Sequence, residues 1–382
     1  MLRRTLLLSL LLALQGCFLF GEDDEELAPA PLVEINTTLQ IQREWSAKLD
    51  GSGDAEGMRF DLAFKDGQIF AASPQGTVSA VSLENGRQLW KVDTDLPISA
   101  GVGVEDDLLA LGTTEGEVVA LSATNGAERW RAQVSSEVLV PPIVHREMVV
   151  VRGQDGRVFG FGGASGTREW VFDRAVPTLS LRGNGPMVAL AGFVYFGLDN
   201  GNLVALRVAD GSVVWEETVA RPEGRNVLER LSDVDGHIAV IASDLYAVGY
   251  QGRIRSFTSN TGRLLWAREL SSFSGVAASR TLLAVSDSDD AVWGLDRLSG
   301  GTLWKQDALA RRQLTSPVHH GDSVVVGDFE GYLHWMSRED GDFQARTQID
   351  SRGLSGSPLV VGDRLVVLGR SGRLASYRIR GG

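Results

Sequence analysis

A pair of glycines followed by a tryptophan recurs along this chain about every 40 residues. In each complete copy the second glycine comes ten residues after the first, and the tryptophan follows four residues later. The five complete copies are Gly76/Gly86/Trp90, Gly116/Gly126/Trp130, Gly156/Gly166/Trp170, Gly201/Gly211/Trp215 and Gly252/Gly262/Trp266. Three imperfect copies follow, namely Asp290/Gly300/Trp304, Gly331/Gly341/Ala345 and Gly372/Gly382. The chain is therefore built from eight repeated units.

Each unit has the pattern of short antiparallel strands. Between the two glycines, as in residues 77–81, apolar and polar residues alternate with the period of a half-buried strand. The second glycine follows Asn, Ser, Asp or Thr, which is typical of a tight hairpin turn that needs a positive φ. Two more strands fit into the rest of a unit, for example residues 188–190 and 193–197. Four strands in each of eight units predict an all-β, eight-bladed β-propeller with four-stranded antiparallel blades.

The tryptophans have a structural role in this interpretation. A large ring at a fixed place on every blade fills the wedge between neighbouring blades, and its burial contributes about 2 to 3 kcal/mol per site. We assign this role to Trp90, Trp130, Trp170, Trp215, Trp266 and Trp304.

The two ends of the chain predict how the ring closes. Trp45 lies in a segment that has the pattern of a tryptophan strand but has no unit before it, and the last unit has no tryptophan strand after it. We therefore predict that residues 41–49 pair with residues 373–379. Such closure removes the exposed edges that an open sheet would leave.

The N-terminus predicts export and a lipid anchor. Arg3 and Arg4 precede an apolar run over residues 6–14, as in a secretory signal peptide, and residues 14–17 (Leu-Gln-Gly-Cys) resemble a bacterial lipoprotein processing site. We predict that residues 1–16 are removed and that Cys17, the only cysteine, is lipidated; an ordinary cleaved signal is the alternative. Phe18 rather than Asp after the cysteine favours the outer membrane of a Gram-negative bacterium, with the protein on its periplasmic side.

The rest of the chain divides into two parts. Residues 17–40 contain an acidic run at 22–26 and a Pro/Ala stretch at 28–31, which predict a charged, flexible tether. Residues 41–382 form the propeller as a single domain, since eight blades account for this length.

Composition and motifs argue against several function classes. A formal net charge of −12 argues against nucleic-acid binding and against direct binding to anionic lipid headgroups, so we expect contact with the membrane through the anchor only. The five histidines show no metal-ligand spacing, and residues 287–290 lack the glycine and glutamate of a calcium loop and predict a polar turn. No phosphate loop, dinucleotide motif or nucleophile elbow is present. We expect no metal, no cofactor and no catalytic residues.

Two intervals break the 40-residue spacing. Gly156 to Gly201 is 45 residues and Gly201 to Gly252 is 51, and the surplus lies within residues 171–187 and 216–237. Both connections run from the outer strand of one blade to the inner strand of the next, so we expect them on one face of two adjacent blades. The residues that predict a protein interface there are Leu179, Leu181 and Arg182 in the first connection and Asp233 and Asp235 in the second. Ordinary loop variation, with Leu179 and Leu181 facing inward, is the alternative.

The same connections resemble those of a known family. The segments LSLRG at 179–183, ERLSDVDG at 229–236, LTSPV at 314–318 and VVGDFEGYLHW at 325–335 are similar to those of BamB, the outer-membrane assembly lipoproteins, and the likeness covers nearly the whole mature chain. The resemblance implies a non-enzymatic subunit of the BAM complex, which folds and inserts β-barrels into the outer membrane. It also implies docking on the periplasmic POTRA domains of BamA through Leu179, Leu181, Arg182, Asp233 and Asp235.

Two further hypotheses accompany this interpretation. The repeat also resembles that of quinoprotein dehydrogenases, which bind pyrroloquinoline quinone and calcium on an eight-bladed propeller, although the adjacent cysteine pair and calcium ligands of those enzymes have no counterpart here. A second hypothesis is that the propeller also binds unfolded barrel strands by edge pairing.

Overall fold

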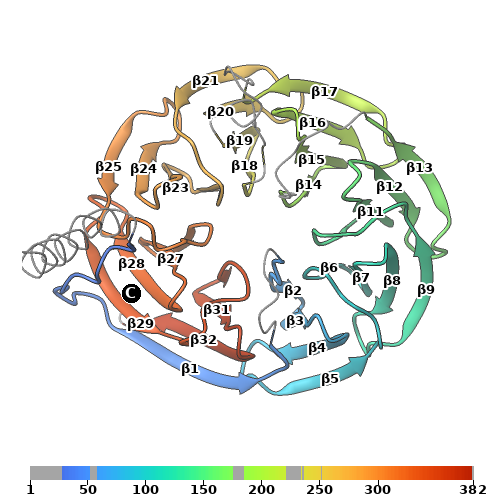
Figure 1. Ribbon diagram of the computed structural model, residues 1–382, viewed down its shortest axis with the longest axis horizontal. Helices are drawn as coiled ribbons and strands as arrows, with labels where there is room; N and C mark the ends of the chain where they lie inside the picture. Colours follow the sequence, from blue (N-terminus) through green and yellow to red (C-terminus); the bar gives the residue numbers. More distant parts are fainter. Residues whose placement is uncertain are drawn as a thin grey trace, which may run out of the picture.

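The computed structural model describes residues 28–51, 58–174, 185–220, 234, 236–250 and 252–380. Within these ranges the chain forms eight four-stranded sheets, which stand around a ring as the blades of a propeller (Figure 1). The prediction of an eight-bladed, all-β propeller is confirmed. No helix in the described ranges is long and apolar enough to cross a membrane.

The first four blades follow one another along the chain. Blade 1 contains β2 (Ala63–Lys65), β3 (Gln68–Ala72), β4 (Thr77–Ser82) and β5 (Gln88–Asp93). Blade 2 contains β6 (Gly103–Glu105), β7 (Leu108–Gly112), β8 (Glu117–Ser122) and β9 (Glu128–Gln133). Blade 3 contains β10 (Ile143–His145), β11 (Met148–Arg152), β12 (Val158–Gly162) and β13 (Arg168–Phe172). Blade 4 contains β14 (Val188–Leu190), β15 (Phe193–Gly197), β16 (Asn202–Arg207) and β17 (Val213–Thr218).

The other four blades complete the ring. Blade 5 contains β18 (Ala239–Ile241), β19 (Asp244–Val248), β20 (Arg253–Thr258) and β21 (Leu264–Glu269). Blade 6 contains β22 (Val276–Ala278), β23 (Leu282–Ser286), β24 (Val292–Asp296) and β25 (Thr302–Gln306). Blade 7 contains β26 (Val318–His320), β27 (Ser323–Gly327), β28 (Tyr332–Ser337) and β29 (Phe343–Gln348). Blade 8 contains β30 (Leu359–Val361), β31 (Arg364–Leu368), β32 (Arg373–Ile379) and β1 (Ile41–Lys48).

The ring closes through its two ends, as the sequence predicts. Strand β1 is the outermost strand of blade 8 and pairs antiparallel with β32, with Ile41 opposite Ile379 and Lys48 opposite Arg373. Blade 8 therefore combines one strand from the start of the propeller with three strands from its end. Each of the eight blades therefore packs against a neighbouring blade on both of its faces.

Tryptophan seams join the blades. The indole N–H of Trp170 in blade 3 donates to the carbonyl oxygen of Val208 in blade 4 at 2.9 Å. The same bond to the next blade is made by Trp45, Trp90, Trp130, Trp215, Trp266 and Trp304. Each ring is wedged between two blades, and the structural assignment of these tryptophans is confirmed.

Residues 28–40, the second half of the predicted tether, lie beside blade 7. The main-chain N–H groups of Thr38 and Leu39 donate to the carbonyl oxygen of Gln344 on β29 at 3.0 and 3.1 Å. Residues 17–27 lie outside the described ranges, and the predicted division into signal, tether and propeller stays a prediction.

Candidate docking face

The connections between blades share one face of the ring. In blades 1 to 7 the chain runs from the innermost strand outward, so the outer-to-inner connections and the turns between second and third strands lie at the same ends of the strands. We call this side the connection face. The strands that flank both long intervals, β13 and β14 for the first and β17 and β18 for the second, meet these intervals at this face.

The five residues predicted to dock on a partner, Leu179, Leu181, Arg182, Asp233 and Asp235, lie outside the described residues, as does Cys17. The structure describes the strands that flank the two connections. The first connection leaves blade 3 after β13 and enters blade 4 at β14, and the second leaves blade 4 after β17 and enters blade 5 at β18. The described flanks of the two connections therefore belong to adjacent blades, and the common face of the connections themselves stays a prediction (Figure 1).

An ion pair links the beginnings of the two connections. Arg174, which directly precedes the first undescribed segment, donates from Nη2 to Glu216 on β17 at 3.0 Å. Asn202 on β16 donates to the other oxygen of Glu216 at 2.8 Å. A partly exposed pair contributes at most about 1 kcal/mol, so its effect is chiefly to fix the position of Arg174.

The end of the second connection is buried. Val234 is 1% exposed and packs in one core cluster with Val219 and Leu245. It lies so close to β15 that a Cβ atom on Gly197 would be 2.0 Å from its carbonyl oxygen. A glycine at position 197 is therefore needed for Val234 to insert, and the second connection returns to the core at a fixed point.

His237 brings this connection to the centre of the ring. Its N–H donates to the carbonyl oxygen of Ser274, and its carbonyl oxygen accepts from Val276 at 2.9 Å. Its Nε2 atom lies 3.7 Å from a carboxylate oxygen of Asp61, which precedes the innermost strand of blade 1 on the opposite side of the ring. Burial lowers the pKa of His237. The contact between His237 and Asp61 joins the opposite blades 5 and 1 across the centre of the ring.

A buried ion pair joins blades 3 and 4 on the connection face. Arg152, at the end of β11, donates to Asp199, in the turn after β15, at 3.0 Å, and their side chains are 1% and 5% exposed. Arg152 also lies over the ring of Phe196, 5.6 Å from its centre. Removing one partner of a buried pair is strongly destabilising. The pair therefore holds blades 3 and 4 together at this seam.

A polar pocket of about 280 Å³ opens between the connections near blades 7, 8 and 1. Arg59, Arg370, Ser316 and Phe329 are among its lining residues. Asp328 is the one carboxylate among the described lining residues, and it is already engaged by Arg312 and His334. In the described part of the chain no three His, Cys, Asp or Glu side chains converge on a point. These residues do not fit a calcium and quinone site.

The predicted acidic turn is a turn held by its own side chain. The carboxylate of Asp287 accepts from the N–H groups of Asp289 and Ala291 at 3.0 and 2.8 Å and from the indole N–H of Trp293 at 2.7 Å. Its oxygens are thus occupied by N–H donors. The interpretation of residues 287–290 as a polar turn is confirmed.

Comparison with known proteins identifies the family. The family model described as outer membrane protein assembly factor BamB matches residues 74–306 and 285–382. BamB of Pseudomonas aeruginosa is 50% identical over 375 residues, which cover 98% of this chain and 98% of that protein. This chain belongs to the BamB family. BamB of Xanthomonas campestris is 38% identical, with 99% of this chain and 98% of that protein covered.

Comparison with solved structures agrees with this family. The crystal structure of BamB from Moraxella catarrhalis matches with a TM-score of 0.81 at 29% identity, over 89% of this chain and 100% of that one. A quinohemoprotein alcohol dehydrogenase from Comamonas testosteroni matches with a TM-score of 0.70 at 13% identity, over 90% of this chain and 77% of that one. The second likeness shows the propeller fold alone, whereas the BamB family shares sequence along the whole chain.

Proposed function

We propose that this protein is a non-enzymatic subunit of the machinery that folds and inserts β-barrel proteins into the outer membrane. In this proposal Cys17 carries the lipid anchor, and the propeller stands on the periplasmic side as part of the BAM complex. Membership of the BamB family carries the proposal, because the 50% identity to the Pseudomonas aeruginosa assembly factor extends over 98% of both chains.

The docking partner that we propose is the POTRA region of BamA. Leu179 and Leu181 would supply the apolar centre of the interface, and Arg182 would pair either with an acidic group of the partner or with Asp233 or Asp235. The geometry around these residues supports the proposal: Arg174 and Val234 hold the flanks of both connections in place on adjacent blades. A rigid frame lowers the entropy that two loops lose when they bind together.

Single substitutions test the two halves of the proposed interface. Leu181→Asp removes an apolar contact, and Arg182→Glu reverses a charge; each should abolish co-purification of BamA from solubilised outer membranes while leaving the propeller folded. A loss of about 3 kcal/mol, typical of an interface hot spot, lowers affinity by more than a hundredfold.

Two control substitutions match these changes in chemistry. Leu298 is 71% exposed in the turn before β25, and Arg87 is exposed in the turn before β5, both on the opposite face of the ring. Leu298→Asp and Arg87→Glu should leave BamA recovery unchanged. Equal recovery with the Leu181 and Leu298 variants would contradict the assignment of the interface.

The alternative is a quinoprotein dehydrogenase, a class of enzyme whose solved structures share the propeller fold with this chain at 13% and 14% identity. Reconstitution with pyrroloquinoline quinone and calcium tests it directly. We expect neither a quinone absorbance band nor calcium-dependent dye reduction. A clear signal in both assays would replace the proposed function with an enzymatic one.

A further inference from the structure

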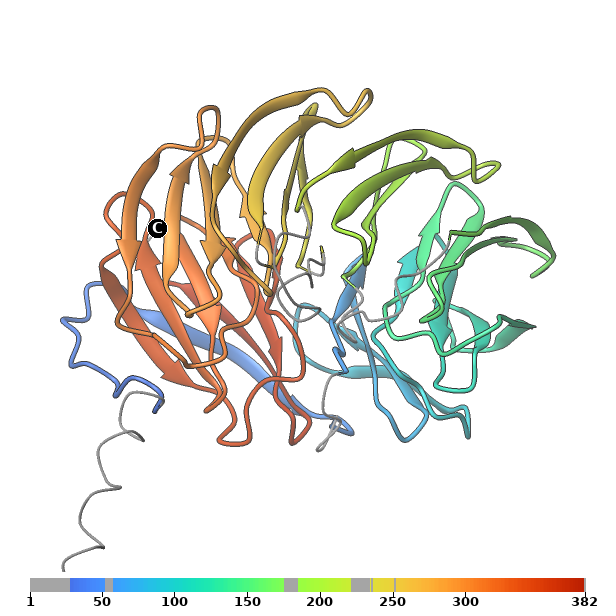
Figure 2. The same cartoon turned by 45° about the horizontal axis from the view of Figure 1, so that its top comes forward.

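The segment 28–39 follows the outside of blade 7 before the propeller begins. Its blue trace lies beside the red strands of that blade in Figure 2. Thr38 and Leu39 bond to Gln344 near the start of β29, and at the other end the N–H of Ala30 donates to the carbonyl oxygen of Ala310 at 2.9 Å. The segment thus runs antiparallel to β29 and reaches the connection face between blades 6 and 7. We call it the strap.

Three arginines of the propeller hold the strap by its carbonyl groups. Arg311 donates to the carbonyl oxygen of Ala28 at 2.7 Å, Arg312 to that of Ala30 at 3.0 Å, and Arg346 to that of Val33 at 2.9 Å. Carbonyl recognition suits this segment, because Pro29 and Pro31 have no N–H to donate. The bonds are charge-assisted and therefore stronger than those between neutral groups.

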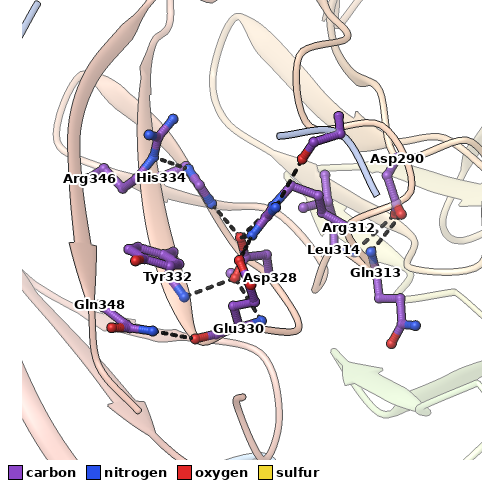
Figure 3. A network of polar contacts seen from close by, with 12 residues as sticks. Asp290, Arg312, Gln313, Leu314, Asp328, Glu330, Tyr332, His334, Arg346 and Gln348 are labelled. Carbon is purple, nitrogen blue, oxygen red and sulfur yellow. Dashed lines mark hydrogen bonds and ion pairs between the residues drawn. The ribbon is translucent and has the colours of Figure 1, made fainter. Parts of the chain in front are cut away.

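A buried network of polar contacts holds the side chains of two of these arginines, Arg312 and Arg346, in position (Figure 3). Arg312 is 3% exposed, donates from Nε to Asp328 at 2.8 Å and pairs with Glu330. Asp328 also contacts Nε2 of His334 at 2.9 Å, and Nδ1 of His334 accepts from Nε of Arg346 at 3.0 Å. Because Arg346 can only donate, His334 is neutral and carries its proton on Nε2. The network thus aims both guanidinium groups at the strap.

The strap also makes apolar contacts with the propeller. Leu32 packs against the core cluster between blades 6 and 7, which contains Trp304 and Met336. Leu39 packs against the cluster between blades 7 and 8. Val33, the neighbour of Leu32, is 41% exposed, and its carbonyl oxygen accepts from Arg346. Leu32 and Leu39 therefore face the propeller, whereas the side chain of Val33 faces the solvent.

We propose that residues 28–39 are a docking strap and that the Arg312 and Arg346 network is its receptor site. The strap brings the N-terminal anchor to the connection face at blades 6 and 7. The part of this inference that concerns the anchor rests on the proposed lipidation of Cys17. From Cys17 to Ala28 the chain spans at most about 40 Å, against about 80 Å from Cys17 to Ile41, so docking halves the reach of the tether.

Hydrogen exchange of the full mature protein in detergent tests the strap without a membrane. The amides of Ala30, Thr38 and Leu39 should be protected, and Leu32→Asp or Arg346→Met should speed exchange in the strap about tenfold or more, with the blade strands unchanged. Val33→Asp introduces the same charge one residue away and should leave exchange unchanged. Unprotected strap amides in the wild-type protein would overturn the proposal.

Energy transfer to labelled lipid headgroups in proteoliposomes tests the position of the anchor. Asp289 and Glu115 occupy equivalent exposed turns of the opposite blades 6 and 2, and the main chain of Asp289 accepts from Arg311. A dye on Asp289→Cys should transfer more strongly than one on Glu115→Cys, and Leu32→Asp should remove the difference. Equal transfer from the two dye positions in the protein with an unmutated strap would contradict the inference about the anchor. Failure of the protein to enter vesicles would contradict lipidation, and hydrogen exchange would then decide whether the strap docks.

Discussion

At the scale of single residues, the glycine and tryptophan of the repeat meet across a seam. Trp170 of blade 3 lies against Gly211 in the turn of blade 4, where an added Cβ would be 2.5 Å from the ring. Gly211 also has a φ of 69°. The sequence predicts a wedge-filling ring and a turn glycine, but the contact between them joins successive units and could not be predicted from one unit alone.

Gly211→Ala should therefore cost more than an ordinary loss of a turn glycine. The positive φ costs a non-glycine residue about 1 kcal/mol, and the clash with Trp170 adds about 1 to 3 kcal/mol. Gly67→Ala is the control, because Gly67 has a φ of 78° and no atom within 4 Å of the added Cβ. Urea unfolding of both variants should show the larger loss at Gly211, and equal losses would contradict the contact.

At the scale of strands and blades, the imperfect seventh repeat has a structural reason. In blade 6 the tryptophan lies on the outermost strand, opposite a small residue: Trp304 faces Gly294. In blade 7 the pair is reversed, since Trp335 on β28 faces Ala345 on β29. Trp335 is fully buried and donates its indole N–H to His320 within the blade. The next blade is the one closed by the chain ends, and Leu39 and Ile41 pack at that seam instead.

Restoring the repeat tryptophan should accordingly destabilise the protein. Ala345 is 3% exposed, so Ala345→Trp forces a second indole against Trp335 and should lower the free energy of unfolding by at least about 2 kcal/mol. Repeat consensus predicts the opposite sign. Thermal and urea unfolding distinguish the two expectations. An Ala345→Trp variant that is as stable as the wild-type protein, or more stable, would contradict the account of the reversed pair.

Blade 7 also makes stability depend on pH. Burial lowers the pKa of His319 to about 4 and lowers those of His320 and His334. The unfolded chain, with a histidine pKa of about 6.5, binds more protons between these values, so the free energy of unfolding falls as pH falls from about 6.5 to 4. For His319 the loss is at most about 3 kcal/mol.

Urea unfolding between pH 7.5 and 4.5 measures this dependence. His319→Gln removes one titrating group and should flatten the curve across the window. An identical slope in the wild-type protein and the variant would show that His319 keeps an ordinary pKa in the folded state.

At the scale of the whole molecule, the sequence predicts the ring, its closure by residues 41–49 and the face that carries both long connections, because each follows from a repeat or from a break in it. The strap could not be predicted in this way. Its Pro/Ala stretch has the composition of a tether. Its receptor site joins Arg312, in the connection before blade 7, with Asp328, His334 and Arg346 of that blade. The sequence pattern does not show that a charged residue in a β-repeat is buried, nor that a segment distant in the sequence contacts it. The role of the five predicted docking residues in binding BamA stays a prediction, which rests on the sequence and on the family.

The most direct test of the proposed function is recovery of BamA with the double variant Leu181→Asp/Arg182→Glu. It should be expressed at the wild-type level as a membrane lipoprotein, unfold at a similar urea concentration and recover no BamA from solubilised outer membranes. The double control Leu298→Asp/Arg87→Glu should recover as much BamA as the wild-type protein. Undiminished BamA recovery by a folded double variant would contradict the account.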